Sequence, residues 1–368
     1  MVWQHYNPVR LLVGAGVSRQ LADFLPLGRI LLVTTEGMCR RGTAADLQHL
    51  CRGNEWVVRC VSANPELDDL DNLCGDLRQA GCVAIVALGG GSVLDAAKVL
   101  SATLCAPGEM HLTHWLRDQS DYRLPKSLPV YCLPTTAGTG AEVTPFATVW
   151  DKRSGQKHSL SGESLYPQMA FLDPELTVSL PWQETLFSAL DATSHSLETL
   201  WNRHATPLSC ALATQALKMI LAALPTLQKR MGALSLRSKV QEASLLGGLA
   251  ISQSRTTLAH SISYPLTARY GVPHGLACSF TLAALAEQVQ RHQAFPNDVP
   301  AELISNVVAM LKELRLSDYL DHYCTGKEVL GCLDEMFTPS RADNFILNAN
   351  TEIIRDVLTQ SCDKQERQ

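Results

Sequence analysis

The chain has 368 residues, which is long enough for two domains and a sizeable core. Its apolar content of 46% and charged content of 18% are typical of a folded globular protein and exclude a disordered one. A net charge of −5 gives no general attraction to nucleic acid or to an anionic membrane, so neither is expected as a partner.

Targeting and redox signals are weak. No apolar run approaches the roughly 20 residues that a membrane-spanning helix requires, and residues 1–8 lack the basic and apolar regions of a signal peptide. The 12 cysteines are scattered, and none forms a Cys-x-x-Cys pair. This pattern indicates free or buried thiols in a reducing cytoplasm, and it argues against a disulfide framework or a cysteine zinc site.

The first half of the chain alternates strand and helix signals. We expect strands at 30–35, 56–61, 82–88 and 129–134, and helices at 43–52, 68–79 and 93–104. The segment 82–88 is apolar throughout, as a strand of a parallel sheet covered on both faces requires. The β-α-β-α order predicts a Rossmann-like, doubly wound parallel sheet.

From about residue 181 the pattern changes to helical periods with few β-branched runs. We expect helices at 183–202, 208–230, 237–260, 275–292, 300–315 and 350–361. Two domains are therefore predicted: a dinucleotide-binding α/β domain at 1–180 and an all-helical, metal-binding domain at 181–368. The last six residues, 363–368, are expected to fray.

A metal site is suggested in the helical half. Asp191 and His195 are four residues apart, so their side chains point to one side of a helix. His260 closes an apolar helical stretch, and His274 opens another helix directly after Pro273. One carboxylate and three imidazoles suit Fe(II) or Zn(II). The Asp–His spacing alone also fits a helix-capping Asp and scattered histidines, because four-apart pairs are common.

A glycine turn, Gly89-Gly90-Gly91-Ser92, lies between an apolar strand and a helix. Glycines let the backbone approach a diphosphate, and the helix N-terminus supplies free N–H groups and a positive dipole. Ser92 is expected to cap the helix, and Asp95, three residues later, to complete an arrangement like a capping box. The turn alone also fits a tight connection without a ligand.

A second segment favours the ligand. Thr135 and Thr136 directly follow the next expected strand, and their hydroxyls, with that of Thr139, can bond to phosphate and ribose oxygens. We therefore expect the cofactor-binding turn to be completed by these three threonines.

Four ordered motifs resemble the iron-containing, or group III, alcohol dehydrogenases from about residue 10 to about residue 350. They are the segments 89–98 and 134–144, the pair Asp191/His195, and His260 with His274. The resemblance implies a dehydroquinate synthase-like architecture, an NAD(P)-linked alcohol dehydrogenase or aldehyde reductase, and a homodimer. The family's metal ligands carry over to Asp191, His195, His260 and His274. The resemblance also implies that Thr144, Phe146 and Trp150 lie near the nicotinamide. It implies that Lys157 lies near the cofactor phosphates or the substrate.

The choice between NAD and NADP stays open. Many NAD-using relatives end the first strand with an Asp that binds the ribose hydroxyls, and here Thr35 stands at that place. The missing carboxylate removes repulsion against a 2′-phosphate and so permits NADPH. Glu36 can still serve an NAD ribose, while Arg40 and Arg41 can serve a phosphate.

One residue departs from the family pattern. Many relatives carry a further histidine four residues after the third metal ligand, where this chain has Tyr264. The departure puts the usual proton relay in doubt, and we expect Tyr264 to pack and to contact the substrate rather than to act as a general acid.

The substrate is predicted from a narrower resemblance. The segments 145–151, 157–160 and 263–267 resemble the branch that reduces phosphonoacetaldehyde to 2-hydroxyethylphosphonate. Arg255, expected on the same helix as His260, and Arg269, expected in the turn before His274, would hold the anionic group. Lys157 and Arg203 would add positive charge, although each of the four also fits a solvated surface position.

Three alternatives remain. One is a general aldehyde, alcohol or polyol dehydrogenase of the same family. Another is a dehydroquinate-synthase-like lyase, which shares the architecture and uses NAD transiently. The third is a non-catalytic nucleotide-binding or scaffold protein. The Asp191–His195 spacing and the Thr135 segment favour a reductase.

Overall fold

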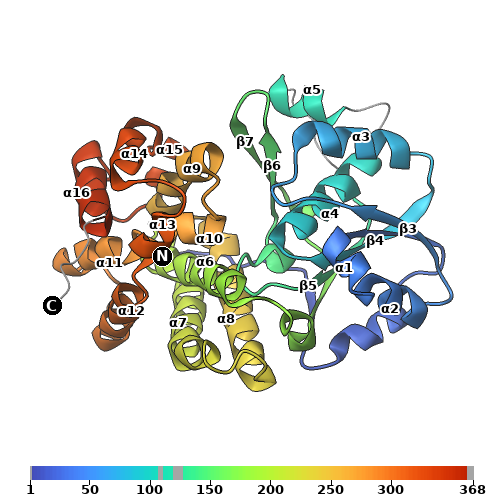
Figure 1. Ribbon diagram of the computed structural model, residues 1–368, viewed down its shortest axis with the longest axis horizontal. Helices are drawn as coiled ribbons and strands as arrows, with labels where there is room; N and C mark the ends of the chain where they lie inside the picture. Colours follow the sequence, from blue (N-terminus) through green and yellow to red (C-terminus); the bar gives the residue numbers. More distant parts are fainter. Residues whose placement is uncertain (1, 107–110, 119–126, 363–368) are drawn as a thin grey trace. The chain divides into compact units, whose positions relative to one another are not determined.

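The computed structural model describes residues 2–106, 111–118 and 127–362 (Figure 1). The chain divides into two compact units, Asn7–Leu180 and Pro181–Gln368, and Met1–Tyr6 groups with the second. The expected fraying of 363–368 lies outside the described residues.

The first unit is built on a six-stranded parallel sheet with the order β1-β8-β5-β4-β2-β3. The predicted fold class, a Rossmann-like parallel sheet followed by a helical half, is confirmed. The two strands missing from the prediction, β1 and β8, have only four residues each, too few to show a period. The strands are β1 Arg10–Val13, β2 Arg29–Thr34, β3 Glu55–Cys60, β4 Cys82–Gly89, β5 Val130–Pro134 and β8 Met169–Leu172.

Helices cover both faces of this sheet. Figure 1 shows α3 (Leu67–Leu77) and α4 (Gly91–Leu104) on one side, and α1 (Glu36–Arg40) and α2 (Thr43–Leu50) on the other. Ile30 and Leu32 of β2 join the core under α1 and α2. Their neighbours Leu31 and Val33 point the opposite way and are equally buried. Burial on both faces explains why the strands read as continuous apolar runs.

The order of the strands reverses between β2 and β4. The chain runs from β2 to the edge strand β3 and returns to pair β4 with the other side of β2. The carboxyl ends of β2 and β4 therefore lie side by side, and each leads into a helix, α1 or α4. Ligands of open α/β sheets bind at such a switch point.

A two-stranded antiparallel hairpin is added to the unit. It joins β6 (Phe146–Asp151) to β7 (Gln156–Ser161). The sequence pattern did not predict it, although the segment carries the proposed residues Phe146, Trp150 and Lys157.

The second unit is a bundle of helices around α6 (Trp182–Leu200). The helix α6 is buried on almost all sides and packs against α7, α8 and α10. The other helices are α7 Pro207–Leu227, α8 Leu234–Ser254, α9 Leu258–Tyr270, α10 His274–Ala277, α11 Leu282–Arg291, α12 Ala301–Glu313, α13 Leu316–Leu320, α14 Gly326–Gly331, α15 Pro339–Ala342 and α16 Thr351–Cys362.

Two predicted helices are wrong in extent. The expected helix 237–260 breaks at Arg255, which has a left-handed φ of 65°, and His260 lies in the first turn of α9. The Asn202 side chain donates to the carbonyls of Ser254 and Arg255 at 3.0 and 2.9 Å, which satisfies the end of α8. Arg255 and His260 therefore do not share a helix. The expected helix 275–292 is likewise two helices, α10 and α11.

The helix α7 corrects an expectation about membranes. By length and composition it could cross a bilayer, with a mean hydropathy of 1.5. In its most apolar stretch of 18 residues, 44% are buried, and the helix packs mainly against α6 and α8, as the core helix of a soluble protein does. This single helix is weak evidence for a membrane.

Candidate active site

The sequence-predicted metal ligands converge within the helical unit. Asp191 and His195 lie one turn apart on α6, His260 lies in the first turn of α9, and His274 begins α10. The Oδ1 atom of Asp191 is the common neighbour. It lies 3.5 Å from Nε2 of His195, 3.6 Å from Nε2 of His260 and 3.8 Å from Nε2 of His274.

These spacings fit one shared cation. Metal–nitrogen and metal–oxygen bonds of about 2.1 Å in a tetrahedron place neighbouring donor atoms ~3.4 Å apart. The Asp191 and His260 side chains are almost fully buried, and that of His274 is one-third exposed. The donor set of one carboxylate oxygen and three imidazole nitrogens suits Fe(II) or Zn(II). The more open His274 side is where a small molecule could approach.

The buried carboxylate of Glu198 holds one of the proposed ligands, His260, in place. This α6 carboxylate is fully buried, and its Oε2 atom accepts a hydrogen bond from Nδ1 of His260. Its Oε1 atom accepts from the Thr257 hydroxyl at 2.8 Å and from the backbone N–H groups of Thr257 and His260 at 2.9 and 3.2 Å. Glu198 thereby caps the start of α9. It also keeps the proton of His260 on Nδ1 and leaves Nε2 to face Asp191.

The electrostatics of the cluster call for positive charge. Burial alone would raise the pKa of Asp191, but the surrounding histidines outweigh it and hold that pKa far below its usual range. Burial would lower the pKa of His260, yet the nearby Glu198 and Asp191 carboxylates raise it to about 10. Burial would also raise the pKa of Glu198, but His260 lowers it. Two buried carboxylates therefore share this pocket, and a divalent cation would replace the protons that balance them.

A glycine lets α10 reach α6. A Cβ atom on Gly275 would lie 1.9 Å from the backbone oxygen of Phe187 on α6, a contact that no side chain permits. Only glycine therefore allows His274, the preceding residue, to come within reach of Asp191.

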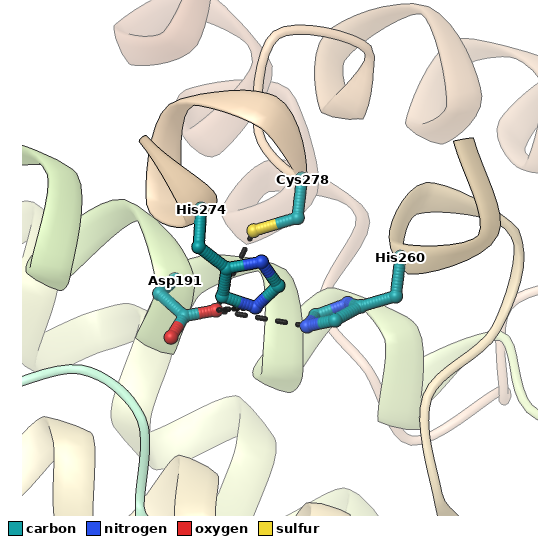
Figure 2. A group of neighbouring side chains, drawn as sticks. All are labelled: Asp191, His260, His274 and Cys278. Carbon is teal, nitrogen blue, oxygen red and sulfur yellow. Dashed lines mark hydrogen bonds and ion pairs between the residues drawn. The ribbon is translucent and has the colours of Figure 1, made fainter. Parts of the chain in front are cut away.

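A thiol lies in the group of mutually close donor atoms, and His195 lies outside that group although its Nε2 is 3.5 Å from Oδ1 of Asp191. Cys278, at the end of α10, is fully buried, and its Sγ atom lies 3.4 Å from Oδ1 of Asp191. The donor atoms of Asp191, His260, His274 and Cys278 all lie within 4.8 Å of one another. Figure 2 shows the thiol directed towards the Asp191 carboxylate. Cys278 was not predicted, although it follows His274 by four residues, the spacing that also separates Asp191 from His195.

The glycine turn in the α/β unit has close neighbours. A Cβ atom on Gly90 would lie 3.2 Å from the Thr136 side chain, and one on Gly91 would lie 2.6 Å from that of Thr139. Thr135 donates its N–H to the carbonyl of Gly89 at 2.9 Å. The two predicted cofactor segments are therefore packed against each other at the carboxyl ends of β4 and β5. The start of α4 has no side-chain cap, so its N-terminal N–H groups suit an anionic ligand.

The predicted capping arrangement at this turn is wrong. The N-cap of α4 is Gly90, and no side chain caps it. The Ser92 hydroxyl instead accepts a hydrogen bond from the N–H of Asn64 at 3.1 Å. Asp95 accepts from the N–H of Thr148 at 2.9 Å, so it ties α4 to the hairpin. Both groups hold the surrounding chain in place.

Lys98 was not singled out in the sequence, yet it positions a proposed cofactor segment. Its side chain is fully buried, and its ammonium group donates to the carbonyls of Thr144 and Phe146 at 2.9 and 2.8 Å. Asp95 lies 4.0 Å away. Burial lowers the pKa of Lys98, and burial raises that of Asp95. The pair fixes Thr144 and Phe146 against α4.

Comparisons with known proteins agree with this geometry. The model of the iron-containing alcohol dehydrogenases matches residues 8–174, and the model of the C-terminal region of that family matches residues 185–323. Together they cover most of the chain.

The chain belongs to the iron-containing alcohol dehydrogenase family.

Within the family, the chain is similar to reductases of small anionic aldehydes, as three comparisons show. The phosphonoacetaldehyde reductase of Streptomyces viridochromogenes is 36% identical over 70% of this chain, and the match spans 66% of that protein. The sulfoacetaldehyde reductase of Bilophila wadsworthia is 29% identical over 76% of this chain and 73% of its own. The structure of the sulfoacetaldehyde reductase of Bifidobacterium kashiwanohense in complex with NAD+ superposes with a TM-score of 0.89 at 26% identity, covering 99% of this chain and 100% of that one. The aligned region is just under two thirds of the Streptomyces protein's length.

The remaining predicted residues of this family member are dispersed. Thr35 caps α1, its hydroxyl accepting from the N–H of Met38 at 3.3 Å. Lys157 of β7 lies 5.6 Å from the ring centre of Trp150 on β6, a cation–π contact. Tyr264 lies one turn after His260 on α9 and is half-buried.

The predicted arginines differ in their surroundings. Arg269 lies in the last turn of α9 rather than in a connecting turn, and it pairs with Glu335 at 2.5 Å. Arg203 donates to the carbonyl of Phe345 at 2.7 Å, so its guanidinium serves the packing of the chain. Arg255 is exposed at the break between α8 and α9.

Proposed function

We propose that the chain is a metal-dependent, nicotinamide-linked alcohol dehydrogenase that acts as an aldehyde reductase. The observation that carries the proposal is the convergence of three histidine Nε2 atoms on one buried carboxylate oxygen of Asp191, at 3.5 to 3.8 Å. The reductases named among its relatives support the same activity.

The residues divide the chemistry between them. Asp191, His195, His260 and His274 would hold the ion, and Glu198 would keep His260 in the tautomer that a ligand needs. The ion would polarise a carbonyl oxygen as a Lewis acid, while a reduced nicotinamide would supply the hydride. Tyr264, one turn from His260, would contact the substrate.

The cofactor would lie on the glycine turn. Gly89, Gly90, Gly91 and the uncapped start of α4 would receive its diphosphate, and Thr135, Thr136 and Thr139 would bond to its oxygens. The chain carries no carboxylate at Thr35, and on α1 the Arg40 guanidinium lies 3.7 Å from Glu36. We propose that both NADH and NADPH are accepted, because neither a fixed carboxylate nor a committed arginine selects one ribose.

The substrate would be a two-carbon aldehyde carrying an anionic group. Two relatives are named for phosphonoacetaldehyde and sulfoacetaldehyde, which share an aldehyde and a tetrahedral anion on adjacent carbons. Arg255 would be the main contact, because it is exposed at the break between α8 and α9, five residues before the proposed ligand His260. The alternative is a general aldehyde reductase without a charge preference.

Metal and turnover test the activity. In His274→Ala and Asp191→Ala we expect loss of bound metal and of aldehyde reduction, while NADH still binds, because the glycine turn belongs to the other unit. Metal content by elemental analysis and nucleotide titration by fluorescence measure the two properties separately. Unchanged metal content and rate in both variants would overturn the proposal.

Substrate charge is tested with a matched pair of arginines. Losing a charge-assisted bond costs about 1.5–3 kcal/mol, so Arg255→Ala should lower kcat/KM for phosphonoacetaldehyde by at least about tenfold and change that for propanal little. The exposed Arg230→Ala serves as the control. Equal losses on both aldehydes, or a wild-type preference for propanal, would leave a general aldehyde reductase.

A further inference from the structure

The thiol of Cys278 is a donor within the cluster that the proposed ligand set leaves unused. It is fully buried, and it lies inside a group in which every donor atom is within 4.8 Å of every other. Its Sγ atom is 3.4 Å from Oδ1 of Asp191, a shorter distance than those to His260 and His274, 3.6 and 3.8 Å. The sulfur therefore lies at least as near to Oδ1 of Asp191 as these two imidazole nitrogens do.

Bond lengths allow the sulfur to share the ion. A zinc–sulfur bond of about 2.3 Å and a zinc–oxygen bond of about 2.0 Å at a tetrahedral angle place the two donors ~3.5 Å apart. The observed separation between Sγ and Oδ1 is 3.4 Å. A fully buried thiol here can also donate weakly to the carboxylate of Asp191, which is the arrangement in Figure 2.

We propose that Cys278 is a metal ligand beside Asp191, His195, His260 and His274, so that the ion has five protein donors and is five-coordinate rather than tetrahedral. The inference rests on the proposed function and concerns the same site. On binding, the Sγ–metal bond replaces the S–H bond, the proton leaves to solvent, and nothing is oxidised or reduced.

A sulfur donor changes which ion the site selects. Thiolate is a soft ligand that favours Zn(II), whereas an all-nitrogen and oxygen site also suits Fe(II). Losing a residue bound directly to the metal should weaken metal binding at least as much as losing a residue that hydrogen-bonds to a ligand. Cys278→Ser should therefore weaken Zn(II) binding by at least about tenfold. Fe(II) binding should change less, and the ratio of the two affinities should fall.

Spectroscopy of the whole chain tests the inference without reference to activity. Metal-depleted protein is loaded with one equivalent of Co(II) or Zn(II) in the absence of added thiols. We expect a thiolate-to-Co(II) charge-transfer band in the near ultraviolet and, by zinc X-ray absorption, a sulfur scatterer at about 2.3 Å. Both signals should be lost in Cys278→Ser and kept in Cys210→Ser, which replaces a buried cysteine on α7.

The outcomes separate the two proposals. Bound metal with nitrogen and oxygen scatterers alone would overturn the role of Cys278 and leave the proposed function standing. Failure to bind any ion, or binding unaffected by His274→Ala, would overturn the proposed function itself. If Cys278→Ser does not fold, the scatterers in the unmodified chain still decide between a sulfur ligand and a thiol that only donates to Asp191.

Discussion

Replacing Glu198 by glutamine tests how the metal cluster is held. In the structure, Oε1 of this carboxylate accepts two backbone N–H groups and one hydroxyl, and Oε2 accepts Nδ1–H of His260 and, more weakly, the Ser194 hydroxyl at 3.4 Å. A carboxamide has one accepting oxygen and one NH2 group, so it cannot serve both sets of donors.

The carboxamide of the Glu198→Gln variant can take two orientations, and the one with the lower free-energy cost determines the expected effect. If the NH2 group faced Thr257, two buried backbone N–H groups would lose their acceptor, at about 1–3 kcal/mol each. If it faces His260, the imidazole can respond by moving its proton from Nδ1 to Nε2. That tautomer presents N–H to the cluster, and an ion must displace the proton. Loss of such an outer-shell partner typically weakens metal binding about 10–100-fold, or roughly 1.4–2.7 kcal/mol.

Competition with a chromophoric chelator measures the Zn(II) affinity of Glu198→Gln, and nitrogen-15 NMR of the histidines reports the tautomer. Glu302→Gln, on an exposed position of α12, is the matched control. An affinity within about twofold of the unmodified chain, roughly 0.4 kcal/mol, would refute the positioning role of Glu198.

Three further changes probe the rest of the chain. Gly275→Ala places a Cβ 1.9 Å from the backbone of α6, so we expect α10 to shift, His274 to withdraw and the metal content to fall. Gly331→Ala, which has open space around it, should leave the metal content unchanged. Elemental analysis measures the metal content, and full content in both variants would contradict the argument. Lys98→Met leaves two backbone carbonyls without their buried ammonium donor. We expect the nucleotide affinity to fall and the free energy of unfolding, measured with urea, to fall by about 3 kcal/mol. An unchanged nucleotide affinity and an unchanged unfolding free energy would exclude a positioning role for Lys98. Arg117, the last residue of α5 (Leu112–Arg117), holds the pKa of Asp151 well below its usual range. The stability that this carboxylate contributes is therefore present above about pH 4 and is lost as the pH falls further. The gap in Tm between the unmodified chain and Asp151→Asn should therefore narrow towards pH 3, and a gap independent of pH would argue against the ion pair.

Local patterns predicted four of the six strands of the parallel sheet and the helical second half of the chain. The apolar run 82–88 predicted a strand buried on both faces, and it is the core of β4. The change of period near residue 181 agrees with the start of α6 at Trp182. Such elements are readable because a strand or a long amphipathic helix imposes its period on neighbouring residues. A break between two helices imposes no such period, so the sequence predicts one continuous helix at 237–260 where the structure has α8 and α9 separated at Arg255.

The candidate site divides in the same way. Sequence alone predicted Asp191 and His195 as a pair, because four residues make one helical turn. Their grouping with His260 and His274 came from the resemblance to the family, since nothing local relates residues so far apart. Glu198 follows His195 by three residues and Cys278 follows His274 by four, but neither was predicted. Their contacts depend on the donors that α9 brings to Glu198 and on α10 folding against α6 at Gly275. The sequence by itself determined the longer strands and helices and the placement of Asp191 and His195 on one side of α6, because both depend on spacing along the chain. Only the tertiary structure decided which carboxylate orients His260 and which thiol joins the cluster, because those contacts depend on how separate helices pack.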